Sequence, residues 1–273
     1  MIELQDIRKS FGEKEILKGV STIMEPGKVN LIIGSSGSGK TVMMKCIVGL
    51  MGVDKGKVLY DNQDFTAMDD KEKKTIRQEI GMLFQGSALF DSMTVEQNVM
   101  FPLEMFGTGT LKEKKARVAE CLERVQLKEA AKKFPAEISG GMKKRVGIAR
   151  AIVLNPKYLF CDEPNSGLDP QTSLLIDKLI TELTQEYNIT TVINTHDMNT
   201  VMESGDHIVY MYQGQKQWEG SNKDIVFSKD QKLNDFIFAS EFLREAKEMR
   251  QLEMFKDGKW RDQLKKEQEG GKK

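Results

Sequence analysis

The order of apolar and polar positions divides the chain into segments of β and of helical character. In residues 1–33, Ile2, Leu4 and Ile7 recur among polar neighbours, and EPGKVNLIIG places a turn before a short apolar strand that ends at Gly34. Further segments predict strands because each is a short apolar run bounded by polar or turn-forming residues. They are residues 56–64, 78–85, 157–164, 188–196 and 207–214.

Segments of helical character lie between these predicted strands. Residues 40–51 carry apolar side chains on most faces, as a buried helix does, and residues 111–127 have one apolar face. Residues 170–187 form another helical segment, and most of residues 86–155 are helical and charged. Strands that alternate with helices predict an α/β fold with a doubly wound parallel sheet, here interrupted by a helical insertion.

The same pattern sets the expected domain boundaries. We expect one domain over residues 1–225, with a core of 1–85 and 156–225 around a helical subdomain of 86–155, followed by a charged helical extension over 226–273. An apolar stripe in the extension either packs on the chain's own core or docks on a partner subunit. The stripe consists of Leu233, Phe236, Ile237 and Leu243, with Phe242 and Phe255 adding apolar bulk, and the final KKEQEGGKK predicts disorder.

Composition narrows the class of protein. Apolar residues make up 39% and charged residues 30% of the 273 residues, and 41 basic residues balance 41 acidic ones. The zero net charge gives no support to nucleic-acid binding, and MKKR at 142–145 is interpreted as a solvated helix face. Neither a secretory signal nor an apolar run of roughly 18 residues occurs, so any membrane spans are expected from another chain. Cys46, Cys121 and Cys161 lie among apolar residues, which fits core positions in a reducing compartment.

The sequence GSSGSGKT has the spacing of a phosphate-binding loop. An apolar strand precedes it and a helix follows, which is the context that this motif requires. Its glycines leave room for backbone N–H groups to face phosphate oxygens at a helix N-terminus. Lys40 would reach the β- and γ-phosphates, and Thr41 would bind Mg²⁺. We expect nucleotide contacts from Gly34, Ser35, Ser36, Gly37, Ser38, Gly39, Lys40 and Thr41.

Polar residues follow two of the later predicted strands. Asp162 and Glu163 end the apolar segment YLFCDEP, and burying a charge without a partner costs several kcal/mol, so the pair predicts a site. A metal beside Thr41 would explain Asp162, and Glu163 is placed to polarise a water that attacks the γ-phosphate. His196 follows another strand, and parallel strands end at one edge, so we expect it near the phosphate. His207, at the start of a strand, is expected to face solvent.

With these motifs, FQ at 84–85, ISGGM at 138–142, SGLD at 166–169 and NTHD at 194–197 occur in an order that resembles the ATP-binding cassette (ABC) ATPases over residues 1–225. The resemblance implies an α/β phosphate-loop NTPase with a RecA-like core, an antiparallel β subdomain and an inserted α-helical subdomain. It implies that Phe11 stacks on adenine and that Gln85 senses both Mg²⁺ and the γ-phosphate. Asp169 would lie in a loop between two subunits.

The resemblance also implies a head-to-tail dimer that encloses two ATP molecules. Ser139, Gly140, Gly141 and Met142 of one subunit would cover the γ-phosphate that the other subunit's loop holds, because a serine hydroxyl can bond phosphate and glycines allow close approach. Two positions depart from the family pattern: Met142 replaces the usual Gln, and Asn165 replaces the usual Thr after DEP. Neither carries the predicted chemistry, so ATP hydrolysis by Glu163, His196 and Gln85, with Mg²⁺ on Thr41, Gln85 and Asp162, stays the expectation.

Within the family, residues 84–103 and SGGMKKRVGIARA resemble the ATPase of mammalian-cell-entry (MCE) lipid transport systems, which share the methionine. That branch implies membrane permease subunits, an MCE substrate-binding protein and phospholipid as cargo that this chain does not bind directly. It also implies a position on the cytoplasmic side of the inner membrane. Whether a small regulatory subunit binds as well is left open by the resemblance. In this segment, the residues that either line a groove for the permease or pack in the core are Phe90, Met93, Val95, Met100 and Phe101.

Other classes of protein fit less well. The main alternative is the ATPase of another importer, for an amino acid, a phosphate or another small solute. A soluble cassette that acts on ribosomes or DNA is disfavoured by the single cassette, the absence of heptads and the zero net charge. A GTPase would require an Asn-Lys-x-Asp guanine-binding motif, which the sequence lacks.

Overall fold

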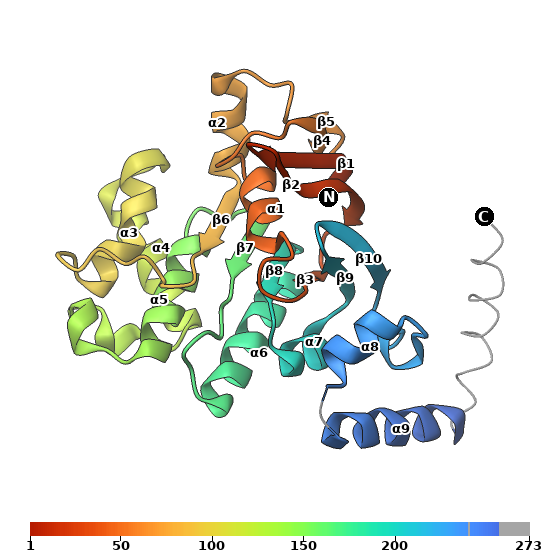
Figure 1. Ribbon diagram of the computed structural model, residues 1–273. Coiled ribbons are helices and arrows are strands. Elements are labelled where there is room, and N and C mark those ends of the chain that lie inside the picture. The colour runs from red at the N-terminus through yellow and green to blue at the C-terminus, as the bar shows by residue number, and fades with distance from the viewer. Residues whose placement is uncertain (240, 257–273) are drawn as a thin grey trace.

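The computed structural model describes residues 1–239 and 241–256, which form two β-sheets with helices around them (Figure 1). The larger sheet has the strand order β10-β9-β3-β8-β7-β6, and its neighbours are parallel except for β10 and β9. Its strands are β3 (Val29–Ile33), β6 (Ile80–Leu83), β7 (Tyr158–Asp162), β8 (Thr190–Thr195), β9 (His207–Tyr212) and β10 (Gln215–Gly220). The predicted parallel sheet is confirmed, and the edge strand β10 is an addition to the prediction.

The smaller sheet is antiparallel and matches the β subdomain that the family resemblance implies. Its order is β2-β1-β4-β5, from β1 (Ile2–Phe11), β2 (Lys14–Met24), β4 (Lys55–Tyr60) and β5 (Gln63–Asp64). The predicted β-structure of residues 1–33 is therefore divided between the two sheets. Helix α2 (Asp70–Gln78) follows β5 and buries only Ile76, so it has no apolar stripe.

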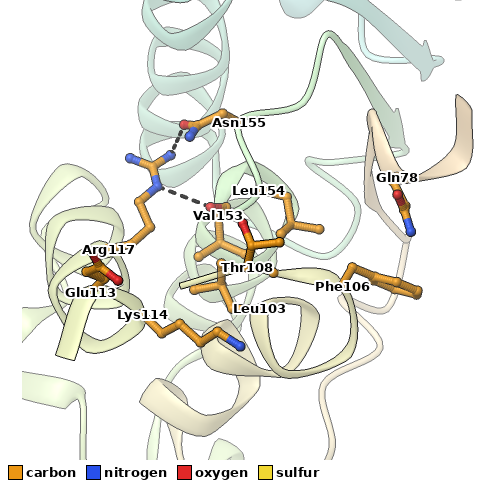
Figure 2. A pocket seen from close by; sticks show the side chains of 11 residues that line it. Gln78, Leu103, Phe106, Thr108, Glu113, Lys114, Arg117, Val153, Leu154 and Asn155 are labelled. Atoms are coloured by element: carbon orange, nitrogen blue, oxygen red, sulfur yellow. Dashed lines mark hydrogen bonds between the residues drawn. The ribbon is translucent and has the colours of Figure 1, made fainter. Parts of the chain in front are cut away.

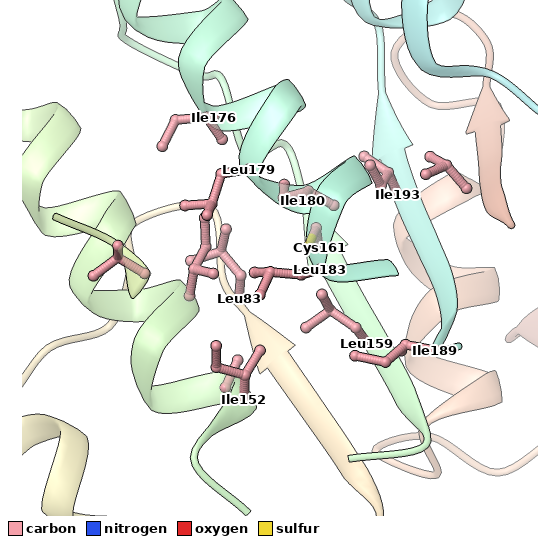
Figure 3. Close-up of a cluster of buried hydrophobic side chains, with 14 of the residues drawn as sticks. Leu83, Ile152, Leu159, Cys161, Ile176, Leu179, Ile180, Leu183, Ile189 and Ile193 are labelled. Carbon is pink, nitrogen blue, oxygen red and sulfur yellow. The ribbon is translucent and has the colours of Figure 1, made fainter. Parts of the chain in front are cut away.

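The larger sheet separates two apolar cores. In β3, Leu31 and Ile33 belong to one core and Ile32 to the other, and both faces are covered, which explains why the strand is apolar apart from Asn30. Helix α6 (Pro170–Glu186) covers one face, whereas α1 (Lys40–Ile47) and the antiparallel sheet pack on the other. Figure 3 shows the first core, where α6 contributes Ile176, Leu179, Ile180 and Leu183 opposite Leu159, Cys161 and Ile193.

Three helices lie together at one side of the sheet (Figure 1). They are α3 (Val95–Phe106), α4 (Leu111–Arg124) and α5 (Gly140–Ile152), with the short turns η1 (Lys128–Ala130) and η2 (Pro135–Glu137) between α4 and α5. Thr94 and Thr110 start α3 and α4 with reciprocal capping boxes. This region coincides with the predicted helical insertion, although its boundaries at 86 and 155 stay predictions.

The described part of the C-terminal segment, residues 226–239 and 241–256, is mostly helical. After η3 (Ile225–Phe227), α8 (Gln231–Ile237) buries Leu233 and Ile237 in the main core, and α9 (Glu241–Lys256) follows. The stripe therefore packs on the chain's own core. The side chains of Phe242 and Phe255 and the predicted disorder at 265–273 lie outside the described residues. Within the described part of the chain, no helix combines the length and apolar character of a membrane span.

Two expectations about polar residues were wrong. The ring of His207 is partly buried, with Nδ1 at 3.0 Å from Asn30 Oδ1 and Nε2 at 2.8 Å from Glu219 Oε1, because the unpredicted strand β10 brings Glu219 beside it. Lys144, in the supposedly solvated MKKR stretch, is 4% exposed. The three cysteines are buried and unpaired, as expected.

Candidate functional site

The carboxyl ends of β3, β7 and β8 form a cleft of about 800 Å³ at one edge of the larger sheet. The cleft therefore lies where a doubly wound sheet places its ligands. It brings together residues that are far apart in the sequence. The predicted site residues that line it are Phe11, Ser35, Ser36, Gly37, Gly39, Lys40, Thr41, Gln85, Asp162, Glu163 and His196.

Glycines shape the loop between β3 and α1. Gly34 has a φ of 149°, and a Cβ there would lie 2.3 Å from the carbonyl oxygen of Met211, so a side chain does not fit. Gly39, with a φ of 105°, starts α1. Gly37 has a φ of 79°, and a Cβ there would meet no atom within 4 Å, so the loop is open toward the cleft.

Lys40 lies folded against this loop. Its Nζ donates to the carbonyl oxygens of Gly34 at 2.7 Å and Ser35 at 3.1 Å, and the residue is 8% exposed. Burial lowers the pKa of the ammonium, while the carboxylates of Glu163 and Asp162 oppose that change. The lysine is thus held as a positive charge at the base of the cleft.

Ser38 does not reach the cleft with its side chain. The residue is 3% exposed, its Oγ is buried without a hydrogen-bond partner, and its N–H donates to the carbonyl oxygen of Ser35 at 3.2 Å. The expected contact of Ser38 with a nucleotide therefore lacks the geometry that its loop neighbours have.

Thr41 and Asp162 share a partner that the sequence analysis missed. Asn194 in β8 donates from Nδ2 to Asp162 Oδ1 at 2.7 Å and to Thr41 Oγ1 at 3.4 Å, and its own Oδ1 is buried without a partner. Hydroxyl and carboxylate oxygens suit Mg²⁺, which usually takes one or two protein ligands besides phosphates and waters. Within residues 1–239 and 241–256, no group of three or more His, Cys, Asp and Glu side chains could hold a metal alone. The donor set fits an ion that is shared with a nucleotide.

Glu163 and His196 face each other across the cleft edge. His196 Nδ1 lies 2.8 Å from Glu163 Oε2 and 2.9 Å from Oε1. Glu163 has a φ of 48°, a conformation that non-glycine residues rarely adopt and that persists only where the surroundings fix it. Its N–H donates to the carbonyl oxygen of Asn194 at 2.8 Å, which supplies part of that restraint.

Lys144 supplies another part of the restraint. Its Nζ donates to the carbonyl oxygens of Glu163, at 3.1 Å, and of Gln85. Burial lowers the pKa of Lys144. The side chain of Gln85 donates to Ser166 Oγ at 3.4 Å. The buried Lys144 ammonium on α5 thus links the helical region to Gln85 and Glu163, which both line the cleft.

The ISGGM segment and Asp169 lie outside the cleft of their own chain. Ser139 caps α5 by accepting from the Met142 N–H at 3.3 Å, and Asp169 caps α6 by accepting from the Thr172 N–H at 2.9 Å. A Cβ on Gly141 would lie 2.5 Å from Thr172 Cγ2, whereas one on Gly140 would lie 3.8 Å from Leu168. Packing inside the chain therefore explains Gly141, and it leaves Gly140 unexplained.

A family model described as ABC transporter matches residues 17–166, more than half of the chain. The chain belongs to the ABC transporter family. This ABC protein is 43% identical over 231 residues to the methionine import ATP-binding protein MetN of Carboxydothermus hydrogenoformans, a match that covers 84% of this chain and 68% of that relative. It is 41% identical over 227 residues to the protein of the same name from Caulobacter vibrioides, with coverages of 82% and 68%.

Solved structures agree with this membership. A bacterial ABC transporter cassette solved as a dimer is 34% identical, with a TM-score of 0.75 over 81% of this chain and 99% of that one. The same cassette has been solved in a post-hydrolysis state with ADP and Pi, with a TM-score of 0.74. A part of the cbiONQ transporter complex from Clostridium perfringens is 30% identical, with a TM-score of 0.77 over 85% of this chain and 94% of that one.

The ABC protein is therefore an ATP-binding subunit and an ATPase. The family and the fold that the sequence implied are confirmed. The MCE branch is not supported, because the relatives described above are named for methionine import.

Several residues of the cleft were not predicted. The ABC motifs do not mark them, and they come from flanking strands and helices: Lys14, Ile16, Val42, Met198 and Phe236. Phe236 belongs to α8, and its ring stacks on Tyr210 with centroids 5.3 Å apart. The only sequence signal for it was its place in the apolar stripe.

A second cavity of about 390 Å³ lies between α3, α4 and the end of α5 (Figure 2). Arg117 extends across it, donating from Nε to the Val153 carbonyl oxygen at 3.1 Å and from Nη2 to Asn155 Oδ1 at 2.5 Å. Nη2 also donates to the Ile152 carbonyl oxygen at 2.9 Å, so Arg117 satisfies two carbonyl groups at the end of α5. The Arg117 guanidinium is therefore bound to groups of its own chain, and its position in the cavity is explained by its role in the fold.

Proposed function

We propose that this ABC cassette binds MgATP in the cleft and hydrolyses it with Glu163 and His196, as one half of a head-to-tail dimer. The observation that carries the proposal is the 2.8 Å contact between Glu163 and His196 at the same cleft edge as Lys40. Phosphoryl transfer requires positioning and charge stabilisation more than covalent chemistry by the protein. This arrangement supplies both.

Lys40 would bind the β- and γ-phosphates. Within the part of the chain that the structure describes, two of its three N–H groups hold the loop carbonyls, so one is left for an anion. Backbone N–H groups at the start of α1 add to this positive end. Phe11 is 50% exposed at the cleft rim, which suits stacking on a base.

Thr41 and Asp162 would hold Mg²⁺, and Gln85 lines the same cleft. The bound ion neutralises charge that develops on the phosphate oxygens. Asn194 would keep the two ligands together, since its amide already contacts both.

Glu163 would orient and deprotonate the attacking water. Its carboxylate is fixed by His196 Nδ1, and its backbone is fixed by Lys144 and Asn194, so little reorganisation is needed. His196 would keep Nε2 for the γ-phosphate or the water. The side chain of His196 is 68% exposed, which leaves that nitrogen accessible.

The second half of the site would come from the partner subunit. Ser139 and Gly140 lie at the N-terminus of α5, away from their own cleft, and no contact with the described residues requires a glycine at 140. A helix N-terminus with a serine cap is suited to a phosphate group. Asp169, which caps α6, would lie at the same interface.

We propose that the ATPase drives the import of a small solute, with an amino acid as the first class of cargo. The support is the identity of 36–43% to relatives that are named as methionine import ATPases. Phospholipid transport with an MCE protein is the second candidate, and it rests on Met142 and on residues 84–103. The position of the cassette in either case would be the cytoplasmic side of the membrane, bound to a permease.

The permease would contact the face formed by the segment after Gln85 and by α3. The rings of Phe90 and Phe101 are 4.8 Å apart, and Phe90 is 41% exposed. Val95 and Met100 are buried, so the core alternative applies to these two. Met105 and Phe106 extend the exposed apolar surface on α3.

The test of the catalytic proposal is Glu163→Gln in the purified complex. We expect ATP to bind and turnover to be lost, because the amide cannot take the proton from water. Glu203→Gln, at an exposed carboxylate of α7 (Met198–Ser204), is the control and should leave turnover unchanged. Normal turnover in the Glu163 variant would remove the residue from the role of base. Co-purified partners separate the two cargo classes, since an MCE protein would favour lipid transport and a solute-binding protein would favour import.

A further inference from the structure

Three buried polar side chains from different elements form a closed ring of hydrogen bonds close to the proposed catalytic residues. Asn165 Nδ2 donates to Asp177 Oδ1 at 2.9 Å and to Thr200 Oγ1 at 3.0 Å. Thr200 Oγ1 in turn donates to Asp177 Oδ2 at 2.8 Å. The three residues, here called the Asp177 triad, are 8%, 4% and 0% exposed, and none of them lines the cleft.

The Asp177 triad joins the two segments that carry the proposed catalytic pair. Asn165 lies two residues after Glu163, and Thr200 is in α7, which begins two residues after His196. Asp177, in α6, connects them. We propose that the Asp177 triad is a positioning device, which sets the separation of Glu163 and His196 without contact to the nucleotide. The proposal rests on the catalytic roles proposed above.

The conformation of Glu163 explains why such a device is needed. Its φ of 48° is unfavourable for a residue with a side chain, so neighbouring bonds must hold it. Lys144 and Asn194 restrain Glu163 itself, whereas Asn165 restrains the loop that follows it. Loss of that restraint would let Glu163 relax away from His196.

The ring of bonds requires an ionised carboxylate. Asp177 accepts two bonds, Asn165 donates two, and Thr200 accepts one and donates one. Each donor in the ring therefore faces an acceptor. Among the described residues, no Lys or Arg hydrogen-bonds or ion-pairs with Asp177. The titratable groups that face it from neighbouring elements are Asp197, which caps α7, and Cys161 of β7.

Protonation would therefore change the ring. Burial raises the pKa of Asp177 to about 6, despite the bonds from Thr200 and Asn165. Asn165 Oδ1 is buried without a partner, so it offers an acceptor to a protonated Asp177 once the amide turns. Such a turn breaks the bond from Asn165 Nδ2, and with it the link to the Glu163 loop.

The test measures steady-state ATP hydrolysis by variants of the intact complex. Thr200→Val keeps the shape and removes the hydroxyl, and kcat should fall roughly tenfold, the rate equivalent of about one hydrogen bond, with KM within about twofold. Thr200→Ser should restore kcat. The matched control is Thr184→Val, which removes a buried hydroxyl of α6 that bonds the Ile180 carbonyl and Thr191, and it should leave kcat unchanged.

The pH profile gives a readout that loss of packing does not mimic. Wild-type kcat should decline as pH falls through the Asp177 pKa of about 6, and Asp177→Asn should abolish that inflection. Wild-type kcat and pH profile in both the Thr200→Val and Asp177→Asn variants would overturn the proposal. An equal loss in Thr184→Val would also overturn it, by assigning the effect to packing. Glu163→Gln in the same series distinguishes this proposal from the proposed function. Normal turnover in that variant would refute the catalytic role of Glu163. Lost turnover in that variant, with wild-type behaviour of the Thr200 and Asp177 variants, would refute only the positioning role of the Asp177 triad.

Discussion

Replacing Asp177 with asparagine should stabilise the protein above neutral pH and not in acid. The carboxyl is 4% exposed, and burial raises its pKa from 3.8 to about 6. Between these pH values the folded state holds a proton that the unfolded state has released, so stability falls as pH rises through this window. Above this pH window the buried carboxylate is ionised, and its desolvation lowers the free energy of unfolding by the full amount.

The magnitude follows from the shift. A rise from 3.8 to about 6 is about two pKa units, which corresponds to about 3 kcal/mol of folding free energy. Asparagine keeps the acceptor for Asn165 but loses the acceptor for Thr200, which costs about 1 kcal/mol. The net gain in the free energy of unfolding should therefore be about 2 kcal/mol at about pH 7.5, and it should disappear at about pH 4.5.

Urea unfolding of the Asp177→Asn variant at both pH values measures this difference. Asp91→Asn, at an exposed carboxylate, is the control and should change stability at neither pH. A variant that is less stable than the wild type at neutral pH would refute the reasoning. It would show that the bonds of the ionised carboxylate outweigh its desolvation.

Four further substitutions test three other parts of the account. Lys40→Met should weaken ATP binding in titration calorimetry because the ammonium that faces the phosphates is lost; unchanged affinity would refute the phosphate assignment. Gly141→Ala should lower the free energy of unfolding by about 1–3 kcal/mol because its Cβ meets Thr172, while Gly140→Ala should not; equal losses would contradict the packing argument. Phe11→Ala should weaken ATP binding by about 1–3 kcal/mol, the value of one base stack, and intact affinity would exclude stacking there.

Periodicity and motifs predicted the core of this fold because both cores are built on apolar runs. Strands β3, β7, β8 and β9 were placed within a few residues, since each is buried on both faces. Helix α2 and strand β10 were missed for the opposite reason. Helix α2 buries one side chain, and the residues of β10 are partly buried or exposed, so neither has an apolar period to detect.

The site was predictable where a motif fixes backbone geometry and unpredictable where long-range contacts decide it. The loop at 34–41 and the carboxylates at the end of β7, Asp162 and Glu163, follow from local sequence. Asn194, Lys144 and Asp177 act through contacts between elements, and only the folded chain brings these together. Lys144 shows the limit most clearly, since a basic stretch on a helix usually faces solvent and here enters the core.

The central claim is that each nucleotide lies between the loop of one subunit and Ser139 of the other, and paired variants in mixed dimers test it directly. With Lys40→Met in one subunit and Ser139→Ala in its partner, one complete site remains, and ATP turnover should persist. With both substitutions in the same subunit beside a wild-type partner, neither site is complete, and turnover should be lost. The reverse pattern, with turnover only when both changes share a subunit, would place Ser139 beside its own loop and contradict the account.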